Sequence, residues 1–115
     1  MQYQISIVEH VLIVSLEGKM IEENVYTDLL AQIENRLNET NGKLIINVEK
    51  LDYINSTGIN FFIKALTKSR IHLGDMVLNG AKGEVLSIVT IAKMDEVFTM
   101  TNSLEEALTI FKNRK

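Results

Sequence analysis

The stretch that decides the fold begins with Leu44-Ile-Ile-Asn-Val48, continues through Ser56-Thr-Gly58 and ends at Leu66. Its first five residues form a nearly continuous, mostly β-branched apolar run, which is typical of a strand buried on both faces. We predict a loop over Glu49–Asn55 and a helix that begins at Ser56. The apolar residues of this helix recur at the spacing of one helix face: Ile59, Phe62, Ile63 and Leu66. Because a strand buried on both faces needs helices to cover it, the stretch predicts an α/β fold.

Ser56 lies at the predicted start of this helix, where Asn55 and Ser56 are both favourable N-cap residues. Backbone N–H groups in the first turn lack intrahelical partners and carry the positive end of the helix dipole, so an anion is stabilised there. Gly58 leaves room for a group to approach closely. From spacing alone, a structural helix cap is the simpler interpretation of Ser56.

The remaining apolar patterns predict the other elements of the fold. Alternation on either side of Glu9-His10 predicts an N-terminal antiparallel hairpin, with the second strand closed by Gly18. A helix should follow, with these residues on one face: Val25, Leu29, Leu30, Ile33 and Leu37. After the central strand and helix we expect a strand at Met76–Leu78, a helix beginning near Gly83 and a short strand at Val97-Phe98. The chain should close with a helix capped by Ser103 and Glu106. We therefore expect a small mixed sheet with about four helices.

Composition excludes several classes of function. The 115 residues suit one domain over 1–115, and a net charge of −3 lacks the basic excess that nucleic-acid binding requires. No cysteine is present, which excludes disulfides and thiol chemistry. The apolar runs are too short to cross a bilayer and the N-terminal residues do not resemble a signal peptide, so we expect a cytoplasmic protein without a membrane partner.

Catalysis by the chain itself has little support in the sequence. His10 and His72 lie in separate segments, without a paired nucleophile and without the spacing of metal ligands. Gly80-Ala-Lys-Gly83 lacks the full pattern of a phosphate-binding loop and reads as a plain turn between a strand and a helix. We expect no enzymatic activity, no catalytic residue, no metal and no cofactor.

The segment Leu44-Ile-Ile-Asn-Val-Glu-Lys-Leu-Asp-Tyr-Ile-Asn-Ser-Thr-Gly58 resembles the core of the STAS domain, specifically that of bacterial anti-sigma factor antagonists. The family pattern is a strand, Leu or Ile, two variable residues, Asp-Ser-Ser/Thr-Gly and an apolar helix. The resemblance extends from Gly18 to the last helix around Leu108, and its most specific part is the Ser-Thr-Gly helix start. It implies a single STAS-like domain.

The resemblance also implies a function. It matches Ser56 to the residue that a partner kinase phosphorylates, with Thr57 as a weaker second acceptor. The unphosphorylated chain would bind an anti-sigma serine kinase with a Bergerat-type ATP-binding fold, and phosphorylation would release it. A metal-dependent serine/threonine phosphatase would then reset the switch. The predicted partner-binding residues are Asn55, Ser56, Thr57, Gly58, Asn60, Phe61 and Lys64.

Two features leave alternatives open. Phe61 falls beside Asn60 and Lys64, away from the predicted apolar stripe, so it is either an exposed contact for a partner or part of a wider apolar face. Asn55 replaces the family's Asp, and Ile21 replaces an acidic residue that is common after the second strand. These departures favour the alternative function of a STAS scaffold or complex subunit without regulated phosphorylation.

Overall fold

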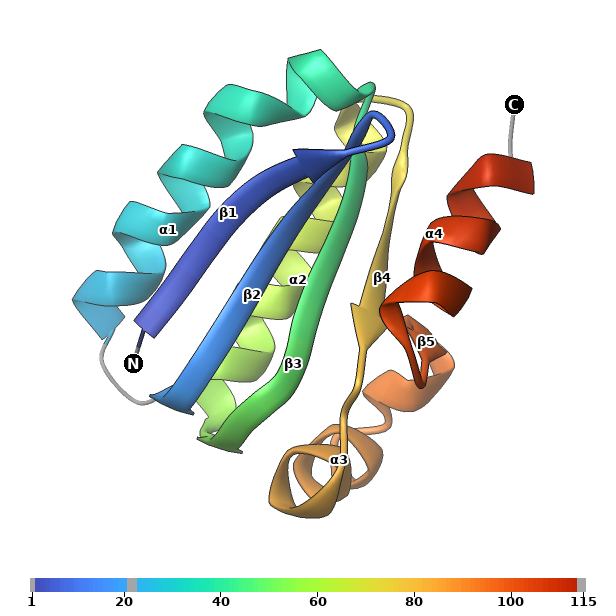
Figure 1. Ribbon diagram of the computed structural model, residues 1–115. Helices are drawn as coiled ribbons and strands as arrows, with labels where there is room; N and C mark the ends of the chain where they lie inside the picture. Colours follow the sequence, from blue (N-terminus) through green and yellow to red (C-terminus); the bar gives the residue numbers. More distant parts are fainter. Residues whose placement is uncertain (1, 21–22, 114–115) are drawn as a thin grey trace.

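The sheet contains five strands in the order β1-β2-β3-β4-β5 (Figure 1). The computed structural model describes residues 2–20 and 23–113. Its elements are β1 (Gln2–Val8), β2 (Val11–Met20), α1 (Glu23–Arg36), η1 (Leu37–Thr40), β3 (Lys43–Ile54), α2 (Ser56–Ile71), β4 (Asp75–Asn79), α3 (Gly83–Ile91), η2 (Met94–Glu96), β5 (Thr99–Thr101) and α4 (Leu104–Asn113). β1 is antiparallel to β2, and every later neighbouring pair is parallel. This arrangement confirms the predicted mixed α/β sheet with an N-terminal hairpin.

The sheet separates two hydrophobic clusters. The larger one joins α1, α2 and α3 to one face of the sheet, where Leu44, Ile46 and Val48 of β3 are fully buried. Ile45, between them, points to the opposite face and packs in the smaller cluster with Ala107 and Phe111 of α4. β3 is therefore covered on both faces, as its apolar run predicts.

The buried apolar residues are thus divided between the two sides of the sheet. Leu108 of α4 is half-buried against the smaller cluster, while Leu29 and Ile33 of α1 belong to the larger one. Figure 1 shows α4 on the other side of the sheet from α1 and α2. α4 follows the last strand and crosses to the face of the sheet that α1 and α2 leave uncovered. There its apolar residues pack against Ile45.

The loop that we predicted over Glu49–Asn55 is wrong, because β3 continues to Ile54. The pairing of β2 with β3 shifts register between Ser15 and Glu17 and again between Gly18 and Lys19. Each shift adds an extra residue on β3, which breaks the alternation of buried and exposed side chains. Two consecutive exposed residues in this half of the strand then give it the polar appearance of a loop.

The last strand also differs from the prediction, whereas the closing helix agrees with it. Val97 and Phe98 precede β5, and the strand consists of Thr99–Thr101. Phe98 is buried against Phe62, with ring centroids 6.1 Å apart, so its apolar character reflects packing in the larger cluster. The predicted N-cap of α4 is present, because the Glu106 N–H donates to Ser103 Oγ at 3.1 Å.

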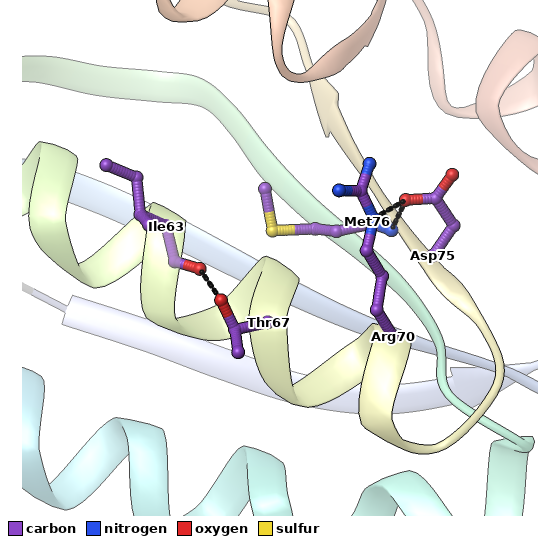
Figure 2. A network of polar contacts seen from close by, with 5 residues as sticks. All are labelled: Ile63, Thr67, Arg70, Asp75 and Met76. Atoms are coloured by element: carbon purple, nitrogen blue, oxygen red, sulfur yellow. Dashed lines mark hydrogen bonds and ion pairs between the residues drawn. The ribbon is translucent and has the colours of Figure 1, made fainter.

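The end of α2 is tied to the start of β4 (Figure 2). Asp75 Oδ1 accepts the Met76 N–H at 2.8 Å and lies 3.6 Å from Arg70 Nε. One turn nearer the start of α2, the Thr67 hydroxyl donates a hydrogen bond to the Ile63 carbonyl at 3.0 Å. The Arg70–Asp75 pair joins α2 to the central sheet at the end opposite to Ser56.

Ile46→Ala should lower the free energy of unfolding by about 2–5 kcal/mol, because Ile46 is fully buried between the sheet and the helices. Denaturant titration measures the change. Ile91→Ala is a matched control, since that side chain is 80% exposed and its loss should change stability by less than about 0.5 kcal/mol. A cost below about 0.5 kcal/mol for Ile46→Ala would contradict the position of β3 in the core.

Candidate functional site

Ser56 is the first residue of α2 and its side chain is exposed. It follows β3 after the single residue Asn55, so it lies at the carboxyl end of the central strand, where ligand sites gather in parallel sheets. The N–H groups of Ser56 and Thr57 belong to the first helical turn and have no intrahelical acceptor. An oxygen anion on Ser56 would therefore meet free N–H donors and the positive end of the α2 dipole.

Asn55, and not Ser56, is the N-cap of α2. Its backbone is extended, and its side-chain oxygen Oδ1 accepts the Gly58 N–H at 3.0 Å. The interpretation of Ser56 as a capping residue is therefore wrong in this structure. Because the Asn55 side chain already accepts the Gly58 N–H of the first turn, the Ser56 hydroxyl is not needed for capping.

The Asn55 oxygen also connects α2 to α1. The Tyr26 hydroxyl donates to Asn55 Oδ1 at 3.3 Å, so a single oxygen receives two hydrogen bonds. Burial raises the pKa of Tyr26 to about 12, which keeps this hydroxyl protonated as a donor. Asparagine thus supplies the acceptor that both contacts use. What it lacks, compared with the family's aspartate, is a negative charge beside Ser56.

Four of the predicted partner-binding residues line one small groove between α1 and α2, with a volume of about 140 Å³. Its lining residues are Tyr26, Thr27, Leu30, Thr57, Asn60, Phe61 and Lys64. The α1 residues in this set were not predicted, because the sequence pattern does not show which helix lies beside α2. Asn60 and Lys64 are exposed, Asn55 and Thr57 are half-buried, and Gly58 is buried.

Phe61 is only 2% exposed, so of the two alternatives for this residue the structure has the wider apolar face and not the exposed contact. Its ring packs against Tyr26 and against Phe62, with centroids 5.9 Å apart in each case. Ile63, which we placed in the core, is 37% exposed. The reason is that α2 packs against α1 as well as the sheet, so its buried face is centred closer to Phe61 than the sequence pattern indicates.

Other surfaces do not contain the predicted residues. A larger hollow of about 560 Å³ lies over β1, β2 and β3, lined by Gln2, Tyr3, Gln4, Ser15, Leu16, Glu17, Asn47 and Lys50.

Within residues 2–20 and 23–113, no group of acidic and histidine side chains is arranged to hold a metal ion. No helix in the same part of the chain has the length and apolar character to span a membrane. Ile21 lies outside the described residues.

Comparison with known families identifies the fold. The model of the STAS domain family matches residues 2–107. The chain belongs to the STAS domain family. A candidate anti-sigma factor antagonist of Bordetella bronchiseptica, BtrV, is 26% identical over 105 residues, which cover 91% of this chain and 90% of BtrV.

Solved structures of STAS proteins share the fold over almost the whole chain. A candidate anti-sigma factor antagonist from Thermotoga maritima has a TM-score of 0.86 at 16% identity, covering 96% of this chain and 95% of that one. The Bacillus cell fate determinant SpoIIAA in its phosphorylated form has a TM-score of 0.73 at 16% identity, covering 96% and 99%. At these identities the likeness establishes the fold.

Phe61→Ala should lower the free energy of unfolding by about 3–5 kcal/mol, because it removes a buried aromatic ring between α1 and α2. Asn60→Ala, at the exposed neighbouring position, should change it by less than about 0.5 kcal/mol. Thermal and denaturant melts of the two variants measure the difference. Equal stability of Phe61→Ala and the unmodified protein would show that Phe61 is not part of the core.

Proposed function

We propose that this STAS domain is an anti-sigma factor antagonist that works as a phosphorylation switch at Ser56. The observation that carries the proposal is the exposed hydroxyl of Ser56 at the first position of α2, beside a cap that Asn55 already provides. The names of BtrV and of the Thermotoga protein support the same class of function. SpoIIAA, which shares the fold, has been solved in both unphosphorylated and phosphorylated forms.

In this proposal the unphosphorylated domain binds an anti-sigma serine kinase of the Bergerat ATP-binding type. The kinase meets the exposed start of α2, contacting Ser56, Asn60 and Lys64 and the rim of the groove at Thr57. Asn55 and Gly58 support this surface through the cap, and Phe61 supports it from the core. Binding withdraws the kinase from its other client, typically a sigma factor.

Phosphorylation reverses binding through charge and solvation. A phosphate adds about −1.5 to −2 charges and three acceptor oxygens. In the free domain the first-turn N–H groups and solvent stabilise these oxygens, so the fold persists. In the complex the same dianion must lose its water, which opposes binding unless the kinase supplies a cation there. A serine/threonine phosphatase then restores the binding state.

Ser56→Asp should weaken kinase binding by at least about tenfold, or about 1.4 kcal/mol. Ser56→Ala should bind the kinase but resist release by ATP, because it cannot accept phosphate. Thr109→Asp on α4 is a matched control that adds the same charge to an exposed position on the other side of the sheet. Isothermal titration with the cognate kinase measures the affinities. Equal weakening by Ser56→Asp and Thr109→Asp would contradict a local effect at Ser56.

Asn55→Asp should change the rate of phosphorylation more than the affinity for the kinase. A carboxylate retains an oxygen for the Gly58 N–H and the Tyr26 hydroxyl, so the cap persists while a negative charge appears beside Ser56. Initial rates of phosphate incorporation and binding constants, measured on the same preparation, separate the two effects. A large loss of affinity with an unchanged rate would contradict this role.

Asn55 also supports a second candidate function. Asn55 preserves the cap without the charge that the family pattern places beside the acceptor. A STAS scaffold or complex subunit without regulated phosphorylation would need only the cap. In that case incubation with an active cognate kinase and ATP would leave the intact mass unchanged, whereas the switch requires the addition of one phosphate.

A further inference from the structure

β1 forms one edge of the sheet, and within the described residues it pairs only with β2 (Figure 1). Natural sheets protect free edges with charged residues, proline, bulges or very short strands. The opposite edge strand, β5, has three residues. β1 has seven, its register with β2 is continuous, and its sequence Gln-Tyr-Gln-Ile-Ser-Ile-Val contains neither charge nor proline. β1 therefore lacks all four of these protections. A covering helix is a fifth kind of protection, and α1 contacts β1 through Asp28 and Gln32 at the Tyr3 hydroxyl.

The hairpin turn determines which backbone groups of β1 face the free edge. Glu9 and His10 have φ values of 52° and 65°, as in a type I′ turn. Such a turn is closed by hydrogen bonding between the residues on either side of it, here the register partners Val8 and Val11. Bonded and non-bonded pairs alternate along an antiparallel ladder. The backbone groups of alternate residues, Tyr3, Ile5 and Ile7, therefore point away from β2.

We propose that β1 pairs with β1 of a second copy of this chain, antiparallel about a two-fold axis that passes through Ile5. This register places Tyr3 opposite the partner's Ile7 and uses all of the outward-facing backbone groups, for about six hydrogen bonds. The two sheets then form one continuous sheet. A two-fold contact of this kind is closed, so assembly stops at a dimer.

The side chains of β1 are compatible with their own symmetry-related copies. On the face toward α1, the ring of Tyr3 lies opposite the partner's Ile7 and Ile5 lies opposite its own copy. The Tyr3 hydroxyl keeps its contacts with Asp28 and Gln32 of α1. On the other face Gln4 meets the partner's Ser6, so two uncharged polar residues are opposed, and the mixed pair of Gln2 with the partner's Val8 lies at the ends. Within β1 no like charges are opposed, so the strand is compatible along its whole length with a second copy of itself.

Exposure provides a driving force for this pairing. Ile7 is 42% exposed and Val8 is 40% exposed, and both would lose solvent contact against the partner's strand. β2 lies between β1 and β3, the strand that leads to Ser56, so pairing along β1 leaves the start of α2 open. The dimer is therefore independent of the proposed switch.

Crosslinking through single cysteines tests the register. The chain has no cysteine, so an introduced one can form a disulfide only with another copy. Ile5→Cys places two thiols across the axis with Cα atoms about 5.5 Å apart, which is within the range of disulfides. Val8→Cys is the control, because in this register the two Val8 positions lie about 20 Å apart, although Val8 is well exposed. Under mild oxidation, non-reducing mass analysis should show a covalent dimer for Ile5→Cys and not for Val8→Cys.

Charge substitutions test the pairing without a covalent bond. Gln4 and Ser6 are exposed and lie opposite each other across the proposed axis. Gln4→Lys combined with Ser6→Lys opposes like charges twice and should raise the dimer dissociation constant about tenfold. Gln4→Lys combined with Ser6→Glu opposes unlike charges and should restore dimerisation. Sedimentation equilibrium from low micromolar to submillimolar concentration measures both constants, and thermal melts verify that both variants fold.

A concentration-dependent dimer with this pattern of crosslinking and charge effects supports the proposal. A protein that remains monomeric at submillimolar concentration would overturn it. So would a dimer whose dissociation constant is the same in the two charge variants, because that dimer would use another surface. Preferential crosslinking of Val8→Cys would overturn the register through Ile5.

Discussion

The burial of β3 on both faces is the constraint on which the rest of the structure depends. Leu44 and Ile46 must be covered on one side and Ile45 on the other, and all three are fully buried. α1 and α2 meet the first requirement and α4 the second. Because α2 begins immediately after Asn55 at the end of β3, the strand that anchors the core also determines where Ser56 is presented.

The start of α2 combines a rigid support with an exposed surface. The Asn55 oxygen holds the Gly58 N–H and the Tyr26 hydroxyl together, so α1, α2 and the end of β3 meet at one atom. Phe61 reinforces the same junction from within, through its contacts with Tyr26 and Phe62. Ser56 takes no part in this support, and a modification of its hydroxyl can change the surface without removing a contact that the fold needs. That separation is what a reversible switch requires.

Much of this arrangement could be predicted from the sequence because local signals were strong. The continuous apolar run in β3, the two-residue turn at Glu9-His10 and the N-cap at Ser103 each depend on neighbouring residues. The Ser-Thr-Gly start of α2 was predicted for the same reason. The predictions failed where tertiary contacts decide. The position of α1 determines that Phe61 is buried and Ile63 is not. Pairing with β2 extends β3 beyond Val48, and the two bulges in that pairing hide the strand pattern in the sequence. The Tyr26 contribution to the site likewise depends on packing between helices that are distant in the sequence.

We propose that Ser56 is the residue that carries the regulatory phosphate. The most direct test is phosphopeptide mass spectrometry of the protein isolated from the organism that encodes it. Cleavage after Lys50 and Lys64 gives the peptide Leu51–Lys64, in which the hydroxyl-bearing residues are Tyr53, Ser56 and Thr57, and fragment ions distinguish them. Phosphate should be found on Ser56 in a fraction of the molecules. A phosphate found only on Tyr53 or Thr57, or a peptide that stays unmodified while its cognate kinase is active, would contradict it.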